Sequence, residues 1–197
     1  TVYPDIGQNM SEKTIVYMVY DKQNIYIGFR CYDTQPDKIK TSLSSRDNSM
    51  SDDLVSFQLD PFNDKQFAYG FFFNPLGIQN DAILTNSNNI DWSFDAVIFS
   101  KGKLDDEGYT VEIQIPFKSL RYINTNPVVM GIMFQRNLQR TSEAATLPLC
   151  GTNNPSSIFI AMKEVEFHDI QRYTLLEVIP AITSSHKKLH QMGNLKA

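Results

Sequence analysis

Two runs of strand-forming residues flank a short turn in the first half of the chain. The first run covers residues 53–60 and the second covers residues 66–77. They meet across residues 61–64, whose proline, asparagine and aspartate favour turns. The pattern predicts a β-hairpin inside an all-β domain, with aspartates at both ends of its strands.

Other segments show the same kind of pattern. Residues 14–20 and 24–32 predict a second hairpin, joined at residues 21–23. Residues 109–115 and 128–136 alternate, as strands with one buried face do. Shorter strands are expected at residues 94–100, 157–162 and 173–182. Polar loops are expected at residues 33–53, 76–93 and 143–157, the first with a helical turn near residues 37–41.

Many short strands between turn signals, with no fixed repeat and no long helix, predict a β-sandwich of jelly-roll type with long polar loops. It should span about residues 3–162. Alternation along the strands assigns a core of eight residues. These are Phe29, Phe57, Phe71, Phe73, Val111, Ile113, Ile132 and Phe134.

The composition and net charge of the chain argue against some classes of function. A net charge of −4 without a large basic cluster argues against a nucleic-acid partner. No apolar run approaches the roughly 20 residues of a membrane helix. The two cysteines, Cys31 and Cys150, permit one disulfide, but Cys31 sits in an apolar strand, where a buried free thiol is commoner.

An ordered series of short motifs resembles one known family over about residues 3–180. The motifs are Thr14, Tyr20-Asp21, residues 25–27, Asp33, Pro36, residues 74–77 (Asn-Pro-Leu-Gly), Asp81, residues 92–95 (Trp-Ser-Phe-Asp), residues 109–112, residues 115–121, residues 131–136, Arg140 and Glu143. Together they are similar to the family 9 carbohydrate-binding-module-like domains. The fullest similarity is to the version at the N-terminus of bacterial outer-membrane β-barrel proteins of unknown function.

The resemblance implies a non-catalytic, extracytoplasmic module, in the periplasm or at the cell surface and associated with the outer membrane. It implies a glycan ligand, and Gln135 matches a sugar-contacting glutamine of the family. The two tryptophans that sandwich the sugar in binding members have no counterpart here. The family's acidic ligand falls near Ser56 and its arginine near Gly70 or Phe71, so glycan binding is expected to be weak.

Candidate ligand-binding residues lie on the predicted polar face and in one loop. Trp92 could stack on a sugar ring or cover one end of the core. A row of outward polar residues could hydrogen-bond sugar hydroxyls beside Tyr69, Tyr26 and Tyr32, or form an ordinary solvated face. The row consists of Arg30, Ser56, Gln58, Glu112, Gln114 and Gln135.

Five carboxylates near the strand ends could hold a structural calcium ion, because calcium prefers oxygen ligands. They could equally be turn and cap formers. They are Asp52, Asp53, Asp60, Asp64 and Asp81. No catalytic motif is present, and Glu112 has no obvious second carboxylate for glycosidase chemistry.

Two functions therefore remain open. The first is weak glycan binding on a polar sheet face. The second is a protein-interaction or assembly domain, with sugar binding lost, attached to an outer-membrane β-barrel. We expect residues 1–172 to form the sandwich and residues 173–197 to form a connector toward a downstream domain, which the resemblance implies is that barrel. The rival interpretation makes residues 173–182 a final strand of the sandwich.

Overall fold

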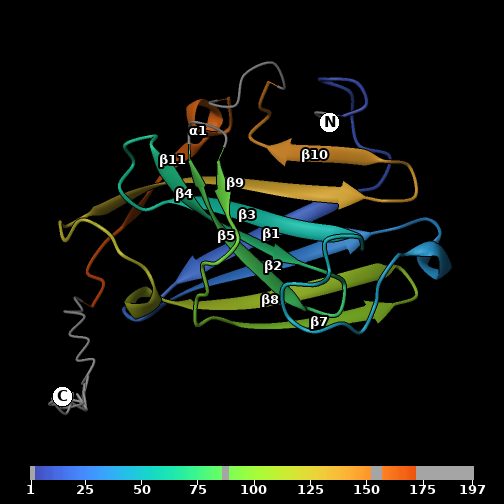
Figure 1. The fold of residues 1–197 in the computed structure, drawn as a ribbon, viewed down its shortest axis with the longest axis horizontal. Helices are drawn as coiled ribbons and strands as arrows, with labels where there is room; N and C mark the ends of the chain where they lie inside the picture. The colour runs from blue at the N-terminus through green and yellow to red at the C-terminus, as the bar shows by residue number, and fades with distance from the viewer. Residues whose placement is uncertain (1–2, 86–88, 152–156, 172–197) are drawn as a thin grey trace, which may run out of the picture.

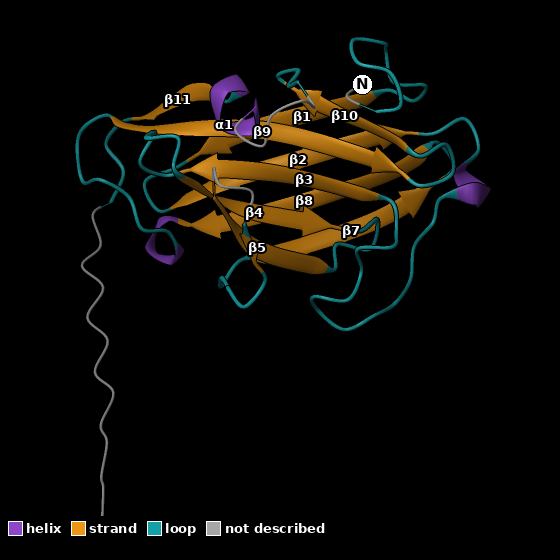
Figure 2. Cartoon of the chain, turned by 45° about the horizontal axis from the view of Figure 1, so that its top comes forward, coloured by secondary structure: helices purple, strands orange, loops and turns teal. Residues whose placement is uncertain are grey.

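The chain forms two antiparallel β-sheets packed face to face (Figures 1 and 2). The computed structural model describes residues 3–85, 89–151 and 157–171. Within these residues the smaller sheet has four strands: β1 (Thr14–Tyr20), β2 (Asn24–Tyr32), β8 (Gly108–Pro116) and β7 (Phe99–Asp105), in that order across the sheet. The predicted β-sandwich is confirmed.

The larger sheet has seven strands within the described residues. Six follow one another across the sheet: β10 (Glu143–Leu147), β9 (Val128–Leu138), β3 (Leu54–Asp60), β4 (Phe67–Phe73), β5 (Gln79–Thr85) and β6 (Ile90–Asp91). The seventh, β11 (Lys163–Phe167), also pairs with β9. Two single 3₁₀ turns (Pro36–Lys38 and Phe117–Ser119) and one short helix, α1 (Ser157–Ala161), complete the elements of the described part of the chain.

Both predicted hairpins form with the expected alternation. In the first, β3 pairs with β4 so that Phe57 lies opposite Phe71. In the second, β1 pairs with β2, and β2 in turn pairs with β8, which places Ile27 opposite Ile113. Because side chains alternate between faces, these four residues all point into the space between the sheets, where they are buried.

The core between the sheets is rich in aromatic rings. The Phe57 ring lies 5.0 Å from the Phe71 ring and stacks on Phe73 at 6.2 Å. Seven of the eight predicted core residues are buried, and the eighth, Phe134, is partly buried and packs on the cluster with its ring 6.0 Å from Phe29. Burying each such ring stabilises the fold by roughly 1.5–3 kcal/mol.

Several predicted boundaries were wrong. The predicted loop at residues 76–93 contains β5, a full partner of β4, and the predicted loop at residues 143–157 contains β10. Both segments are rich in polar or small residues, so the pairing partner decides their structure rather than propensity. The short strand predicted at residues 94–100 begins only at Phe99.

Near the end of the described chain, residues 157–161 form helix α1 instead of the predicted strand, and β11 follows. Short apolar runs are compatible with either structure, and packing settles which one forms. The predicted strand at residues 173–182 and the connector at residues 173–197 lie outside the described residues. No helix in the described part of the chain is long and apolar enough to cross a membrane.

A buried charge network ties the two sheets together at one end of the sandwich. Arg136 is 2% exposed, and its Nη1 donates to the carbonyl oxygens of Lys13 and Tyr32, at 3.2 and 3.0 Å, and to Thr14 Oγ1 at 3.0 Å. Arg140 donates to both carboxylate oxygens of Asp33, at 3.0 and 3.1 Å. Both of these bonds come from Nη1, and Nη2 donates to Glu12 Oε1 at 2.9 Å, so one guanidinium joins two buried carboxylates.

Candidate functional site

The predicted polar row is divided between two opposite faces of the molecule. Three of its members point outward from the smaller sheet, and three lie on the outer side of the larger sheet. The expectation of one shared face was wrong, because β2 and β8 do not belong to the sheet that contains β3 and β9. The two groups are Arg30, Glu112 and Gln114, and Ser56, Gln58 and Gln135.

The outer side of the larger sheet is largely covered by the chain itself. Helix α1 brings Phe159 onto Ala68 and Met133, and Cys150 and Met162 complete a second apolar cluster. Figure 2 shows α1 lying above the sheet near β9. The position near the family's arginine ligand is closed as well: a side chain at Gly70 would collide with Leu84 and meet the Phe72 ring.

The sequence-predicted residues on this side have local partners. Gln135 donates from Nε2 to Asn137 Oδ1 at 2.6 Å, and Gln58 donates to Ser56 Oγ at 3.2 Å. Both Gln58 and Ser56 are buried. Trp92 is 46% exposed and packs against Phe72, with ring centroids 5.6 Å apart. Trp92 follows β6 and packs on the larger sheet, on the opposite side of the molecule from Arg30 and Glu112.

Tyr69 is a core residue. Its ring is buried and stacks on Phe94 at 5.0 Å, and its hydroxyl accepts a hydrogen bond from the Arg121 N–H at 3.3 Å. Burial raises the pKa of the Tyr69 hydroxyl, and Arg121 partly opposes this. A buried ring cannot offer its face to a ligand, so the aromatic surface must come from elsewhere.

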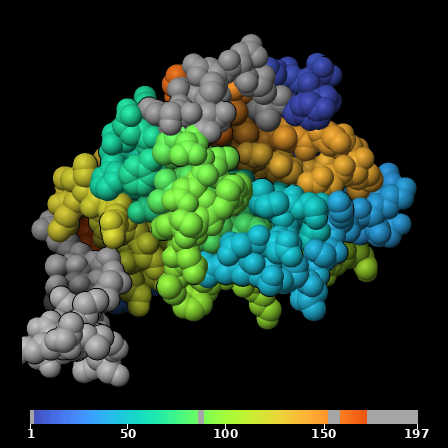
Figure 3. Space-filling model, viewed as in Figure 1, coloured from blue at the N-terminus to red at the C-terminus, as the bar shows by residue number. Residues whose placement is uncertain are grey.

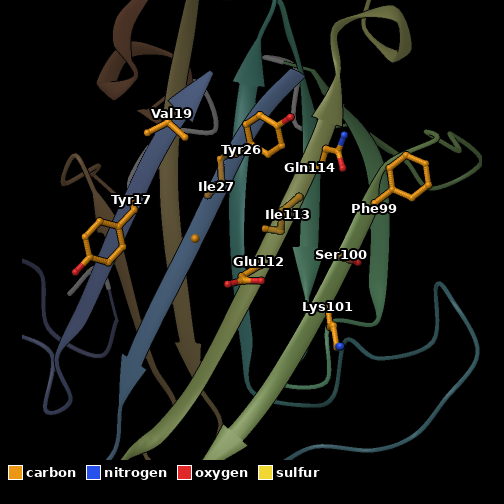
Figure 4. Close-up of a pocket in the computed structure, with 11 residues that line it drawn as sticks. Tyr17, Val19, Tyr26, Ile27, Phe99, Ser100, Lys101, Glu112, Ile113 and Gln114 are labelled. Atoms are coloured by element: carbon orange, nitrogen blue, oxygen red, sulfur yellow. The ribbon is translucent and has the colours of Figure 1, made fainter. Parts of the chain in front are cut away.

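The outer face of the smaller sheet carries a shallow trough (Figure 4). Two rows of residues run across its four strands. The trough encloses about 460 Å³, within the size range of small-ligand sites. The first row is Tyr17, Gly28, Glu112 and Lys101, and the second is Val19, Tyr26, Gln114 and Phe99.

Two exposed aromatic side chains stand on opposite sides of this trough. Tyr17 is 61% exposed and Phe99 is 58% exposed, although both stand on regular strands. Between them Gly28 has no side chain, so the Tyr17 ring has open space beside it. Figure 4 shows Tyr17 and Phe99 at opposite sides of the sheet, with Glu112 and Gln114 between them.

Two polar side chains of the trough already form hydrogen bonds within the protein, and a third does not. Gln114 donates from Nε2 to Asn24 Oδ1 at 3.1 Å, and the Tyr26 hydroxyl donates to Asp21 Oδ2 at 2.9 Å. These bonds hold Gln114 and Tyr26 in place. Within the described residues the Glu112 side chain forms neither a hydrogen bond nor an ion pair, even with Lys101, which lies opposite it on β7. Its carboxylate is available to a ligand.

Arg30, by contrast, is fully engaged beside the trough. Its Nη2 donates to Asp105 Oδ1 at 3.1 Å and to Glu107 Oε2 at 2.9 Å, and its guanidinium lies 4.8 Å from the centre of the Tyr32 ring. The bond from Arg30 lowers the pKa of the Asp105 carboxyl, and the same contact raises the pKa of Arg30. Arg30 therefore shapes the trough margin rather than offering free donors.

The five carboxylates of the predicted calcium site do not come together. Asp52 accepts bonds from Ser42 and Asn74, whereas Asp60, at the other end of β3, accepts the N–H groups of Phe62 and Lys65. The other three accept backbone N–H groups as well, and of these only Asp64, in the β3–β4 turn, lies near Asp60. These pairs are Asp53 with Gln139, Asp64 with Gln66, and Asp81 with Ala96. In the described part of the chain no three acidic, histidine or cysteine side chains could hold a metal ion.

The arrangement favours binding over hydrolysis. Glu112 is the single acidic residue among those that line the trough, whereas a glycosidase needs two carboxylates flanking the scissile bond. Cys31 and Cys150 are both free and buried, one in the main core and the other in the cluster under α1. Burial raises the pKa of the Cys31 thiol, which makes it a poor nucleophile.

The sequence interpretation missed Tyr17, Phe99 and Lys101 as members of the site. The alternation of residues 14–20 does place Tyr17 and Val19 on one face, opposite Val16 and Met18, but that face had no assigned neighbour. Phe99 could not be placed, because the strand that carries it was expected to begin at residue 94. Only the register between β7 and β8 brings it beside Gln114.

Comparisons with known proteins agree with this fold. Two matching solved structures are family 9 carbohydrate-binding modules from Caldicellulosiruptor kristjanssonii, one in complex with glucose and one with cellotriose. The glucose complex is 20% identical, with 81% of this chain and 78% of that chain covered and a TM-score of 0.49. The cellotriose complex is 19% identical, with coverages of 88% and 84% and a TM-score of 0.50.

A third match, from Bacteroides uniformis, is 12% identical, with coverages of 83% and 73% and a TM-score of 0.54. Curated proteins give no match. The family model described as "Carbohydrate family 9 binding domain-like" matches residues 8–149, which is most of the chain and includes every described strand except β11. The chain therefore belongs to the carbohydrate family 9 binding domain-like family.

Proposed function

We propose that this domain is a non-catalytic carbohydrate-binding module that holds a neutral glycan in the trough on its smaller sheet. The observation that carries the proposal is the pair of exposed rings, Tyr17 and Phe99, on either side of the unpaired Glu112 carboxylate. Exposed aromatic side chains on regular strands are costly to leave in water, and they become useful when a ligand covers them.

The chemistry of the trough suits a sugar. Aromatic faces pack against the apolar C–H surfaces of a sugar ring, and planar polar groups bond its hydroxyls. Glu112 can accept from two hydroxyls, and the Gln114 amide is held in position by Asn24. Lys101 lies opposite Glu112 in the sheet, so the site carries one charge of each sign, which favours a neutral ligand over an acidic one.

Weak binding and an extracytoplasmic, outer-membrane-associated location form part of the proposal. The trough is shallow and open, so a bound sugar keeps one face in water, which limits affinity. The location is supported by the ordered motifs that this chain shares with domains at the N-terminus of outer-membrane proteins. The solved relatives that hold glucose and cellotriose set the first ligands to try.

The test is a titration of the 197-residue chain with cellotriose and a panel of other neutral oligosaccharides, followed by NMR chemical shifts and calorimetry. Tyr17→Ala and Phe99→Ala should each weaken binding about 2- to 10-fold. Glu112→Ala should weaken it about tenfold or more, because a bond to a charged group is lost. All three side chains are exposed, so thermal stability should hardly change.

Trp92→Ala is the matched control, since it removes an exposed ring from the opposite sheet. It should leave binding unchanged. If Trp92→Ala or Gln135→Ala abolishes binding while the trough variants do not, the site is wrong although the function stands. If the folded chain binds no glycan at millimolar concentration, the function itself is wrong.

The competing proposal is a protein-interaction or assembly domain that has lost sugar binding and serves an outer-membrane β-barrel. The cover of α1 over the larger sheet favours it, because the face near Gly70 has become part of the protein interior. A pull-down with the folded domain as bait separates the two. Capture of a protein partner that a Tyr17→Ala, Phe99→Ala double variant still binds, without any glycan binding, would favour assembly.

A further inference from the structure

The β1 strand is an open edge of the smaller sheet. It pairs only with β2, and from Ile15 to Val19 it forms no backbone hydrogen bond with any other described residue. Figure 4 shows β1 as the outermost strand, with Tyr17 and Val19 standing on it. An open edge presents unpaired N–H and C=O groups, which natural proteins normally protect.

The opposite edge strand, β7, is protected in the usual ways and β1 is not. β7 carries Lys101 and Lys103, and its Gly102 N–H donates to the Leu76 carbonyl at 3.1 Å. The β1 sequence, Thr-Ile-Val-Tyr-Met-Val-Tyr, has no charged residue, proline or glycine. Its β-branched and aromatic residues favour further strand pairing. The contrast indicates that β1 is kept open for a partner strand.

The partner that fits this edge best is a second copy of β1. An antiparallel pair centred on Tyr17, the middle residue of the strand, is two-fold symmetric. It places Ile15 opposite Val19 of the other copy, and this apolar pair favours the sheet. One residue beyond each end of the strand, it places Lys13 opposite Asp21. Both flanking residues are exposed in the single chain.

We propose that two copies of this chain associate through an antiparallel β1–β1 pair, which joins their smaller sheets into one continuous sheet. The two Lys13–Asp21 contacts, related by the two-fold axis, select this register over shifted ones. The trough of each copy then opens on the same face, and the two Tyr17 rings meet at the axis. This last consequence rests on the proposed glycan function, and it would give a long glycan two linked binding sites.

The test is sedimentation velocity of the 197-residue chain over a wide concentration range, without any glycan. The chain should move reversibly from monomer to dimer. Lys13→Asp and Asp21→Lys each turn two attractive contacts into two repulsive ones, and each should raise the dimer dissociation constant about tenfold or more. An equimolar mixture of the two variants should regain dimerisation, because every contact in the mixed dimer is again between opposite charges.

Lys103→Asp is the control, with the same charge change on the other edge strand, and it should not alter association. Melting temperatures establish that each variant is folded, which matters for Asp21 because its carboxylate accepts the N–H groups of Gln23 and Asn24. The amides of Val16 and Met18 point to the open edge, because Ile15, Tyr17 and Val19 bond to β2, and hydrogen exchange at these two amides should slow as concentration rises.

Four outcomes would overturn the proposal. These are a monomer at all concentrations, a dimer that neither charge reversal weakens, folded variants that fail to recover on mixing, and Val16 and Met18 amides whose protection is independent of concentration. The last would mean that another segment of the same chain covers the edge. None of these depends on glycan binding, so the proposed function and the dimer fail separately.

Discussion

Replacing Arg136 by methionine should remove a large part of the domain's stability. The methionine keeps most of the apolar stem, so the change isolates the guanidinium. The Nη1 group donates to Lys13, Thr14 and Tyr32, and the guanidinium lies 3.8 Å from the Asp33 carboxylate. Arg136 thus joins β9 of the larger sheet to both strands of the β1–β2 hairpin.

The magnitude follows from what the substitution leaves behind. Arg136 is 2% exposed, and breaking a buried ion pair by removing one partner typically costs about 3–5 kcal/mol. Arg140 still satisfies both oxygens of Asp33, which limits the damage. Asp53 is the carboxylate left without its nearby cation, and one of its oxygens already lacks a hydrogen-bond partner. We expect a loss of about 3 kcal/mol, out of a total of about 5–15 kcal/mol for a domain of this kind.

Urea unfolding measures this loss, with Trp92, the single tryptophan, as the fluorescent probe. The slope of the free energy against urea should not change, because the surface exposed on unfolding is the same. Arg121→Met is the control: Arg121 is exposed, so its replacement should stay within about 0.5 kcal/mol. A loss below about 1 kcal/mol for Arg136→Met, or an equal loss in the control, would refute the reasoning.

Three further predictions concern a buried carboxylate, a tight turn and calcium. Burial raises the pKa of the Asp53 carboxyl above its unfolded value, although the Gln139 N–H and Arg136 partly oppose this. Ionising Asp53 therefore costs stability as the pH rises from about 4 through the folded pKa. Asp53→Asn should therefore gain stability relative to the parent across that window in urea titrations, and a difference independent of pH would contradict this. Gly77→Ala should destabilise the domain by about 2 kcal/mol or more in the same assay, because Gly77 has φ +79° and the Cβ of an alanine there would lie 2.7 Å from the Lys101 carbonyl carbon. A loss below about 1 kcal/mol would be too small for such a clash. Millimolar calcium or a chelator should leave the melting temperature unchanged, because Asp52 and Asp60 are occupied in separate turns, and a rise of several degrees with calcium would mean that ion binding rearranges them.

The strands that could be predicted are those with a sharp contrast between their two faces. Residues 109–115 alternate between buried Val111 or Ile113 and exposed Glu112, so period and propensity agree. β5 was missed because its buried positions include the polar Gln79 and the turn formers Asn80 and Asp81. They become strand residues only because β4 lies alongside and because the loop at residues 42–52 supplies their polar partners.

That loop illustrates why such partners are invisible in the sequence. Ser49 donates from its N–H to Asn80 Oδ1 at 3.2 Å, and Arg46 Nη2 reaches Asp81 at 3.1 Å, across more than thirty residues. Figure 3 shows the cyan loop lying against the light-green segment around β5 and β6. A polar residue that is satisfied over such a distance gives no local signal of its burial.

For the candidate site too, some features could be predicted from the local sequence, whereas others depend on pairing between distant segments. Exposure of Glu112 could be predicted, because alternation within one strand fixes the face of each residue. Which strands share that face could not, since sheet membership depends on pairing between distant segments. Gln135 and Glu112 alternate equally well, yet they stand on opposite sides of the molecule. Assigning both to one row was an error of topology, not of periodicity.

The residues that carried the family resemblance explain why it predicts the fold more reliably than the binding face. Asn74 accepts the N–H groups of Leu76 and Ile78, at 3.1 and 2.9 Å, and Gly77 packs against Gly102, so this motif docks the β4–β5 turn onto β7 of the other sheet. Asp81 and Arg140 are likewise bonded within the protein. Such residues persist because the sandwich needs them, whatever it binds. A ligand site has no such constraint, so one face can close under a helix while the opposite face supplies exposed rings and a free carboxylate.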